Sequence, residues 1–421
     1  MARVIKRVVP LVALLLAACL SFWLSPAPQG QPDVEYWGEY VRLAPGVGFV
    51  VNHDSYGYIQ VAQEPHRLLL PQEVRQSRPL YALLGAAVGY PLTAALRLAS
   101  HHGLLLPFYP EDPRIAGYYA GFVLLNGLAL LASLLLLSHL VELLTAGQGA
   151  AWQFYALAWV LVANPITKAF FWTAHQQMFA FLVPLFCLAL ALQVAKRLLS
   201  GRQLTSLAFG LGLLPLVYGS FILAWPAMAY GVVQAARRAP NPGQRWLVVA
   251  ARLLWSGVLF GLPTLLWIAL LRTQGTTYYN HEAARFHQLV WLPEAWPLPE
   301  FWDVVTAKLQ AYAASLGVMR WWLLGGAGLL GATWWRLWPR PQVALPSATG
   351  PALGWVFGCF VLFFALLGYY PERLAYTLLP LVLCLLAGLL PHWPPRYARP
   401  AALVGAAGWH LYVLLSYGPF S

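Results

Sequence analysis

Apolar runs long enough to cross a lipid bilayer recur along the whole chain, separated by short clusters of arginine and lysine. A transmembrane helix needs about 20 apolar residues. Hydrophobic residues make up 60% of the 421 residues and charged residues only 10%, whereas soluble domains carry roughly 25% charged residues. The sequence therefore predicts an all-α polytopic membrane protein with a single transmembrane domain over residues 1–421.

The positive-inside rule predicts the orientation. With the N-terminus in the cytoplasm, clusters such as Lys196, Arg197 and Arg202 lie inside, and of the 14 acidic residues only Glu142 joins them. The net charge of +12 therefore reflects topology and does not indicate nucleic acid. We expect about eleven spans, near residues 8–24, 115–141, 150–167, 176–195, 204–217, 220–236, 247–271, 317–337, 351–369, 372–390 and 400–417.

Two segments depart from simple spans. Residues 79–99 are apolar enough to cross, but every later loop would then change sides and the arginine clusters would face outward. The rule therefore favours an interfacial or re-entrant helix on the outer side. Residues 204–236 lie between two basic clusters and are interrupted by Gly210, Gly212, Pro215 and Gly219, which predicts a pair of short, broken helices.

The N-terminus has a basic region followed by Leu16-Ala17-Ala18-Cys19, which resembles a lipoprotein cleavage box. Apolar sequence continues beyond it to Leu24, so an uncleaved first helix is the favoured interpretation. The four cysteines all fall inside apolar runs at unrelated spacings. They form neither a disulfide framework nor a zinc pattern.

Most residues with useful chemistry lie in the outer segments. These are a long first loop (25–114), a short turn (168–175), a second large loop (272–316) and a turn at 369–373. The first loop contains His53-Asp54-Ser55-Tyr56-Gly57-Tyr58. A carboxylate at the mouth of a membrane bundle is a candidate functional group. The alternative is that Asp54 caps a helix over 55–63, since aspartate is a preferred N-cap.

The layout resembles the GT-C superfamily of membrane glycosyltransferases, which includes protein O-mannosyltransferases and aminoarabinose transferases. The similarity rests on an acidic residue soon after the first span, here in Asn52–Ile59, and on the element Arg78-Pro79-Leu80-Tyr81. It extends to a polar turn before a span at 164–179 and to the arginine that heads a proline-containing span at 372–380. No single motif among these is specific.

The resemblance implies transfer of a sugar from a polyprenyl-phosphate donor to an extracytoplasmic glycan, lipid or protein acceptor. Many relatives carry a second acidic residue in the second outer loop, where this chain has His175. This departure leaves dependence on a divalent metal open, and we expect no other cofactor. His53 indicates a metal site only if further ligands converge on it. The composition is compatible with a bacterial inner-membrane protein.

Elementary chemistry supports the same interpretation. Such a transfer needs a base for the acceptor hydroxyl, positive charge for the departing phosphate and a groove for the isoprenoid chain. Asp54 is the candidate base of an inverting displacement, and Arg373 the candidate phosphate ligand with Lys168 or Arg78 assisting. The broken helices, with Tyr218 at their outer turn, are the candidate groove.

The remaining substrate-binding candidates are polar or aromatic residues of the outer segments: His53, Tyr56, Tyr58, His175, Tyr218, Tyr278, Tyr370 and Glu372. Each has a simpler alternative. Arg373 is also explained as an interfacial anchor that pairs with Glu372. Tyr278 fits an interfacial aromatic belt, and His175 fits a polar cap of the following span.

Two other classes of function are compatible with the composition: a lipid or glycolipid transporter, and a non-catalytic scaffold of the cell envelope. A carrier commonly places coupling residues near the midplane of the membrane and is built from repeats. This chain has no internal repeat of hydropathy. Beyond His139, Arg252 and Arg320, few ionisable residues fall inside its expected spans.

The orientation is testable with single cysteines near Gln72 and near Gly243, in a variant without the four native cysteines. An impermeant maleimide added to intact spheroplasts should label the first position and not the second, because only the first lies in an outer loop. Labelling of the Gly243 position from outside would contradict this topology.

Overall fold

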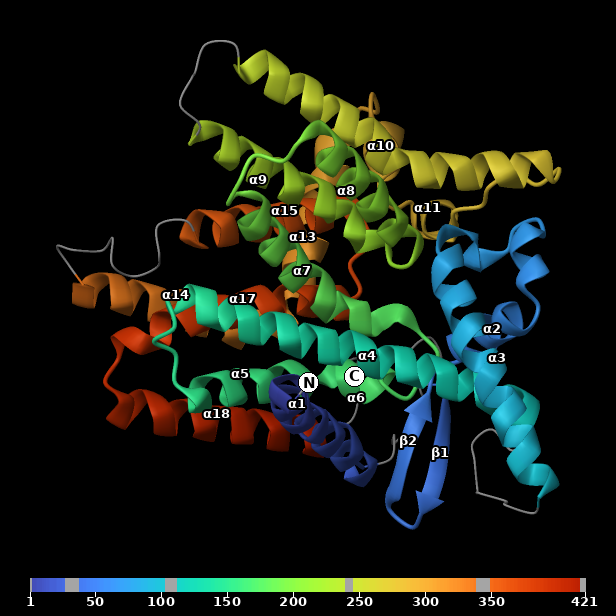
Figure 1. The fold of residues 1–421 in the computed structure, drawn as a ribbon, viewed down its shortest axis with the longest axis horizontal. Coiled ribbons are helices and arrows are strands. Elements are labelled where there is room, and N and C mark those ends of the chain that lie inside the picture. The colour runs from blue at the N-terminus through green and yellow to red at the C-terminus, as the bar shows by residue number, and fades with distance from the viewer. Residues whose placement is uncertain (1, 27–37, 103–111, 239–244, 338–348, 417–421) are drawn as a thin grey trace.

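The computed structural model describes residues 2–26, 38–102, 112–238, 245–337 and 349–416. It is 81% helical, and long helices lie side by side in one bundle (Figure 1). Among the described residues, seven helices are long and apolar enough to cross a membrane. The prediction of a helical polytopic membrane protein is therefore confirmed.

Six helices pack around one apolar core. Fully buried side chains such as Leu130, Leu161 and Leu188 fill this core. Each helix covers the apolar face of its neighbours and so removes that face from solvent. The six are α1 (Ala2–Ser21), α4 (Pro113–Leu144), α5 (Ala151–Val162), α7 (Phe179–Val194), α17 (Leu379–Leu389) and α18 (Pro395–Leu415).

A second group of helices packs on α7 and carries the broken pair. The segment expected to be broken forms two short helices, and Tyr218 lies between the 3₁₀ turns Leu214–Leu216 and Gly219–Leu223 that separate them. Proline at 215 removes a backbone donor there. The group comprises α8 (Gly201–Leu213), α9 (Ala224–Arg237), α10 (Arg245–Thr273) and α15 (Thr349–Leu367).

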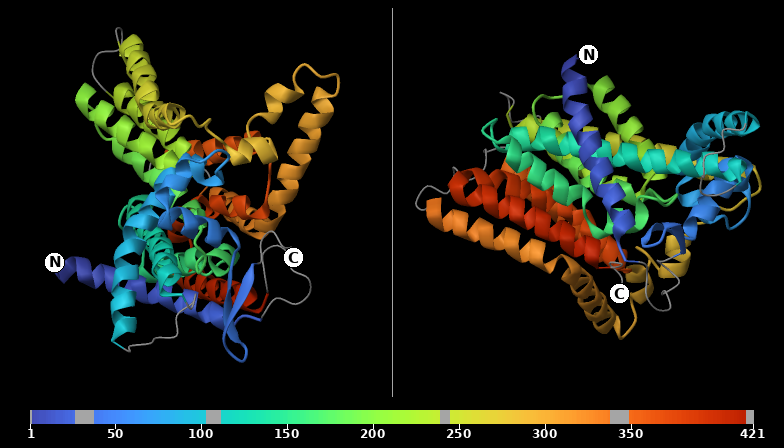
Figure 2. Two further views of the ribbon diagram at one scale, coloured as in Figure 1. Left: turned by 90° about the vertical axis from the view of Figure 1, so that its right-hand side faces the viewer. Right: turned by 90° about the horizontal axis from the view of Figure 1, so that it is seen from below.

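The other helices connect these groups. Helices α13 (Phe301–Leu316) and α14 (Arg320–Leu337) meet at an angle around Gly317–Met319 (Figure 2). The shorter helices at the end of the bundle that carries the site are α2 (Asp54–Gln63), α6 (Pro165–Phe170), α11 (His281–Phe286), α12 (Trp291–Ala295) and α16 (Glu372–Ala375).

Residues 79–99 lie in α3 (Pro79–His101), which packs across the start of α4. Glycines allow this close approach: a Cβ atom at Gly85 would lie 2.1 Å from the ring of Phe122. Helix α3 is one of the seven helices long enough to cross a membrane, and the other six overlap expected spans. The expected spans near 8–24 and 150–167 correspond to shorter apolar helices.

The helical fold also contains one short antiparallel hairpin, formed by β1 (Glu39–Ala44) and β2 (Val47–Val51) in the loop that follows the first helix (Figure 1). Its turn is Pro45-Gly46, with Gly46 at φ +73°. This order of proline and glycine suits a type II turn, and valine-rich flanks favour strands. Residues 27–37 and 103–111 of the same loop lie outside the described residues.

The hairpin is docked on the bundle through Phe49. Its ring lies 6.0 Å from Trp23, just after α1, and 5.5 Å from Trp172. Aromatic pairs at such distances add to the stabilisation from burial alone. Because β2 leads directly into Asn52 and Asp54, this docking fixes the start of the segment that carries the candidate base.

Candidate functional site

A cavity of about 460 Å³ lies at the end of the bundle that carries α2 and α11. Its volume falls in the usual range of small-molecule sites. Six segments distant in sequence contribute to its wall. The lining residues used below are Asn52, His53, Asp54, Tyr58, Arg75, Arg78, His175, Gln176, Gln177, Tyr218, Glu282, Arg285, Phe363, Leu367 and Arg373.

One wall is the turn after α6, held in place by a buried amide on α4. Asn126 is fully buried, and its Nδ2 donates to the carbonyls of Phe171 at 2.9 Å and Thr173 at 2.8 Å. The Tyr119 hydroxyl donates to the carbonyl of Trp172 at 2.6 Å. These bonds pair backbone oxygens that a buried non-helical turn would otherwise leave unsatisfied.

The same turn is tied to the start of α2. The Ala174 N–H donates to Ser55 Oγ at 2.9 Å, and the Asn52 N–H donates to Thr173 Oγ1 at 3.2 Å. Helix α2 begins at Asp54, whose N–H donates to Asn52 Oδ1 at 2.8 Å. Asn52 therefore supplies the side-chain acceptor at this helix start, and the interpretation of Asp54 as the cap is wrong.

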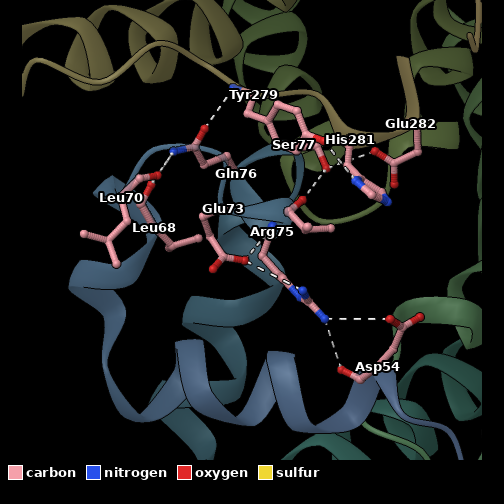
Figure 3. A network of polar contacts seen from close by, with 11 residues as sticks. Asp54, Leu68, Leu70, Glu73, Arg75, Gln76, Ser77, Tyr279, His281 and Glu282 are labelled. Carbon is pink, nitrogen blue, oxygen red and sulfur yellow. Dashed lines mark hydrogen bonds and ion pairs between the residues drawn. The ribbon is translucent and has the colours of Figure 1, made fainter. Parts of the chain in front are cut away.

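The carboxylate of Asp54 faces two positively polarised groups across the cavity. Its Oδ1 lies 3.7 Å from Arg75 Nη2 (Figure 3), and its Oδ2 lies 3.6 Å from His175 Nε2. Both distances exceed those of ordinary hydrogen bonds. These two neighbours orient the carboxylate. Because the side chain is 52% exposed, the carboxylate is still accessible from the cavity.

The tautomer of His175 follows from its backbone contact. The N–H of Gln177 donates to His175 Nδ1 at 3.1 Å, so Nδ1 acts as an acceptor and the proton of the neutral ring lies on Nε2, which faces Asp54. Burial lowers the pKa of His175 to about 3, against the opposing effect of Asp54. The imidazole is therefore neutral at neutral pH.

The arginines keep Asp54 ionised. Burial raises the pKa of its carboxyl group, but the positive charges of His175 when protonated, Arg75, Arg373 and Arg78 together lower that pKa below its ordinary value. Of these four groups, the three guanidinium groups keep their charge at neutral pH. Asp54 thus provides a proton acceptor that is present as the carboxylate.

Arg75 is positioned by an aromatic ring and by a glycine. Its guanidinium carbon lies 5.1 Å from the ring centroid of Tyr58, and its Nη1 lies 3.8 Å from Glu73 Oε1. A Cβ atom at Gly57 would lie 2.1 Å from Arg75 Nη2. The guanidinium therefore occupies space that only glycine leaves open at this point of α2.

Arg78 joins the loop that follows the first helix to the loop that carries α11. It forms an ion pair with Glu282 at the start of α11, and its charge opposes the rise that burial causes in the pKa of the Tyr58 hydroxyl. Nearby, the buried Gln76 accepts from the Tyr279 N–H at 2.8 Å and donates to the Leu70 carbonyl at 2.8 Å (Figure 3). Side chains of one loop thus hold the backbone of the other.

Arg373 reaches the same cavity from α16. Its guanidinium carbon lies 5.9 Å from the ring centroid of Phe170, and the same buried ring lies 5.2 Å from the ring of His175, measured between centroids. The expectation that Asp54 and Arg373 share one cavity therefore agrees with the geometry.

The cavity favours an anionic ligand. Four arginines line it (Arg75, Arg78, Arg285 and Arg373), against two carboxylates (Asp54 and Glu282). Since one of those carboxylates already pairs with Arg78, the remaining guanidinium groups produce a positive potential over the space in front of Asp54. Guanidinium groups match the oxygens of phosphate particularly well.

Two neutral polar groups also lack partners in this wall. Gln176 Oε1 and Gln177 Nε2 have none among the described residues, although each side chain is only 2% exposed. Buried polar groups are normally hydrogen-bonded. One acceptor and one donor are thus available to a ligand with neutral polar groups.

Several of these residues were not predicted: Arg75, Gln176, Gln177, Glu282 and Arg285. For Arg75 the sequence does contain an indication, since this arginine lies three residues before Arg78 in the same loop. The glutamines gave no signal, since only the structure reveals that their amide atoms are buried without partners.

The structure places other predicted residues outside the cavity. Lys168 is buried, and its Nζ donates to the carbonyls of Val413, at 2.8 Å, and Ser416. Its ammonium thus satisfies the C-terminal end of α18, so the expectation that it assists at the phosphate is not supported. Tyr278 and Glu372 do not line the cavity either.

Tyr56 and Tyr370 are used in structural contacts. The Tyr56 hydroxyl donates to Glu39 Oε2 at 2.7 Å, on the hairpin side of α2. The Tyr370 hydroxyl donates to the carbonyl of Ala365 at 2.7 Å. Neither side chain lines the cavity, and each hydroxyl donates to an acceptor within the protein.

Within the described ranges, His, Cys, Asp and Glu side chains form no group of three that could hold a metal ion. His53 and His175 both line the cavity with Asp54, but they do not converge on a common point with it. Comparisons of the chain with family models, with curated proteins and with solved structures gave no match.

The buried neutral state of His175 predicts a pH dependence of stability. The unfolded chain binds a proton near pH 6.5, whereas the folded state binds it only near pH 3. Stability should therefore be complete above pH 6.5 and fall as the pH drops below it, by roughly 2 kcal/mol between pH 7.5 and 5.

Equilibrium unfolding in mixed micelles at both pH values would measure this loss. His175→Asn keeps an acceptor for the Gln177 N–H without the titrating ring, so it should lose roughly 2 kcal/mol less than the parent over this range. The exposed His53→Asn serves as the matched control and should behave like the parent. An equal loss in all three proteins would contradict the assignment of His175 as a neutral side chain in the folded state.

Proposed function

We propose that the protein is a membrane glycosyltransferase that moves a sugar from a polyprenyl-phosphate donor to an extracytoplasmic acceptor, with Asp54 as the general base. One observation carries the proposal: a single accessible carboxylate faces an arginine-rich cavity at one end of an apolar helical bundle. A reaction that takes a proton from a hydroxyl and releases a phosphate needs this pairing of charges.

The proposed reaction is a single displacement. The acceptor hydroxyl gives its proton to Asp54 while its oxygen attacks C1 of the sugar, and the bond between C1 and the phosphate oxygen breaks. The polyprenyl phosphate leaves with that electron pair, so the configuration at C1 is inverted. Asp54 has the accessibility that such a base requires, while His175 Nε2–H at 3.6 Å orients the carboxylate.

Arg373 is the proposed main ligand of the donor phosphate, with Arg75 and Arg78 contributing charge. All three lower the pKa of Asp54, so they lie near the base. Charge that builds up on the leaving phosphate is stabilised by groups already in place before the reaction. Phe363 and Leu367 of α15 provide an apolar wall for the first part of the isoprenoid chain.

Donor binding also activates the base. In the empty cavity, the arginines hold the pKa of Asp54 below its ordinary value, which makes it a weak proton acceptor. A bound phosphate compensates part of that positive charge and therefore raises the pKa of Asp54 toward the range of an effective base. The base is thus strengthened only when the donor is present.

We also propose how the helices are arranged in the membrane. Eleven spans arranged as in the GT-C superfamily place the cavity on the extracytoplasmic face, and α3 then lies at the outer interface. This arrangement satisfies the positive-inside rule. The aromatic and basic residues at the helix ends suit a bacterial inner membrane, with a glycan, lipid or protein as the acceptor.

A lipid or glycolipid transporter and an envelope scaffold are the competing functions. The ionisable groups of this cavity belong to the outer segments and not to the middle of the long helices. Coupling and substrate sites of transporters are usually found near the midplane of the membrane. The arrangement therefore favours chemistry at the membrane surface.

Asp54→Asn should abolish transfer and leave donor binding nearly intact, because it removes the proton acceptor without removing an arginine. We expect kcat to fall by at least 10²-fold. The readouts are transfer from a panel of polyprenyl-phosphate hexoses and pentoses in proteoliposomes, and binding of polyprenyl phosphate. Glu64→Gln is the matched control, since this carboxylate of the same loop pairs with Arg67 and lies outside the cavity. Unchanged transfer by Asp54→Asn would rule out its assigned role.

Arg373→Lys keeps the charge and loses the planar fork, so it should weaken binding of polyprenyl phosphate about tenfold, an effect of roughly 1.4 kcal/mol. Transfer at saturating donor should fall less than in Asp54→Asn. If donor binding fell equally in the two variants, the division of roles would be wrong.

The pH dependence should differ between the free and the donor-bound enzyme. The acidic limb of kcat/KM reports Asp54 in the free enzyme, below its ordinary pKa of 3.8, whereas that of kcat reports the donor complex. Because the phosphate offsets the arginines, the limb of kcat should lie at higher pH. Two coinciding limbs would show that the donor does not contact the arginines near Asp54.

A further inference from the structure

A second cavity of about 540 Å³ lies between helices α5, α14, α17 and α18. It shares no lining residue with the first. Nearly all of its wall is apolar or aromatic, which excludes a free sugar or nucleotide as the natural ligand. The lining residues used below are Trp321, Gly325, Leu329, Trp393, Tyr397 and Gly405.

The cavity follows one side of α14, which runs alongside α17 and α18 (Figure 2). Trp321, Gly325 and Leu329 line it at intervals of four residues. One turn further, Thr333 accepts a hydrogen bond of 2.9 Å from Trp393 Nε1. At 1.5 Å per residue, the lining from 321 to 329 is roughly 12 Å long. This length is most of one leaflet of a bilayer, whose hydrocarbon core is about 30 Å thick in total.

Glycines in two of the helices keep the groove open. A Cβ atom added at Gly325 or at Gly405 would meet no atom within 4 Å. Glycine costs a helix interior close to 1 kcal/mol relative to alanine, and neither position has the positive φ that requires glycine. The space in front of these two glycines is therefore available to a ligand.

Positive charge gathers where the groove ends. The guanidinium carbon of Arg336 lies 5.5 Å from the ring centroid of Trp393, and that of Arg396 lies 4.7 Å from the ring centroid of Tyr397. Both rings line the groove. Among the described residues, no carboxylate forms an ion pair with either arginine.

Exposed tryptophans lie at the same end of the groove as these arginines. Trp334 is 51% exposed and Trp335 is 85% exposed, next to Arg336 at the end of α14. Tryptophan is enriched where the hydrocarbon of a bilayer meets its headgroups. The two arginines thus lie where the phosphate of a lipid would lie if its chain occupied the groove.

The opposite end of the groove is less suited to a phosphate. It has one arginine, Arg320, whose guanidinium carbon lies 5.3 Å from the ring centroid of Trp321. Two guanidinium groups from two helices can hold a phosphate from two sides, whereas one cannot. The charge pattern therefore selects the end with Arg336 and Arg396.

We propose that this groove binds an anionic phospholipid, with one acyl chain between α14 and α18 and the phosphate between Arg336 and Arg396. The bound lipid fills a space that the helices leave open and joins the end of α14 to the start of α18. Basic pockets between membrane helices are known to hold anionic headgroups. A zwitterionic lipid fits the groove equally well but compensates less charge, so it binds more weakly.

The test uses the full-length protein in dodecyl maltoside, titrated with phosphatidylglycerol or with phosphatidylcholine of the same acyl chains. Phosphatidylglycerol should raise the midpoint of thermal unfolding in a saturable way, on the order of 5 °C, because it binds the folded state. Phosphatidylcholine should raise it by less than half as much. Equal effects of the two lipids would overturn the proposal.

Two variants and their matched controls locate the site. Gly325→Leu fills the groove and should remove the effect of phosphatidylglycerol, whereas Gly328→Leu, on the same helix with open space in front of it but outside the groove, should retain it. The double variant Arg336→Gln/Arg396→Gln should lose the preference for phosphatidylglycerol, and Arg320→Gln should keep it. A full lipid effect in Gly325→Leu would overturn the proposal.

A second copy of this chain is the other occupant that an apolar groove could accept. Light scattering on the same detergent samples distinguishes the two cases, since a dimer formed through this face would dissociate in Gly325→Leu. A change of mass in that variant, with no lipid effect in the parent, would replace the lipid by a protein partner.

Discussion

The site depends on one buried amide. Asn126 Nδ2, on α4, contacts the backbone oxygens of the turn that follows α6, and this turn carries His175, Gln176 and Gln177 into the cavity. A non-helical turn inside an apolar bundle is costly because its carbonyls cannot reach water. Asn126 and Tyr119, both on the long helix α4, together reduce that cost, so the irregular backbone of this turn is held by a regular part of the fold.

The contacts of this turn also determine the positions of the charged residues in the cavity. Ser55 and Asn52 are tied to it, so the direction of Asp54 follows from contacts that involve no charge. The arginines are added from other segments, each supported by a ring: Arg75 by Tyr58 and Arg373 by Phe170. Mutual repulsion among guanidinium groups is thereby opposed by packing, and the cavity keeps its positive potential without a bound anion.

Much of this was predictable from the sequence, and the failures have physical reasons. Hydrophobic runs predicted nearly every long helix, and the charge pattern directed attention to Asp54 and Arg373, because exposed charges are rare in such a chain. The hairpin was missed although Pro45-Gly46 is a recognisable turn, since strands are not expected in a membrane bundle. Lys168 was misplaced because no local pattern reveals that its ammonium satisfies the end of a helix 245 residues away in sequence.

The hairpin has a practical consequence for imaging. A bundle of helices embedded in detergent gives electron microscopy few external features by which single particles can be aligned. The tip at Gly46 has no atom within 4 Å of an added side chain, while Phe49, three residues further on, is anchored between Trp23 and Trp172. An epitope inserted at this tip would project from the molecule and yet move with it, so a bound antibody fragment would report the orientation of the whole protein.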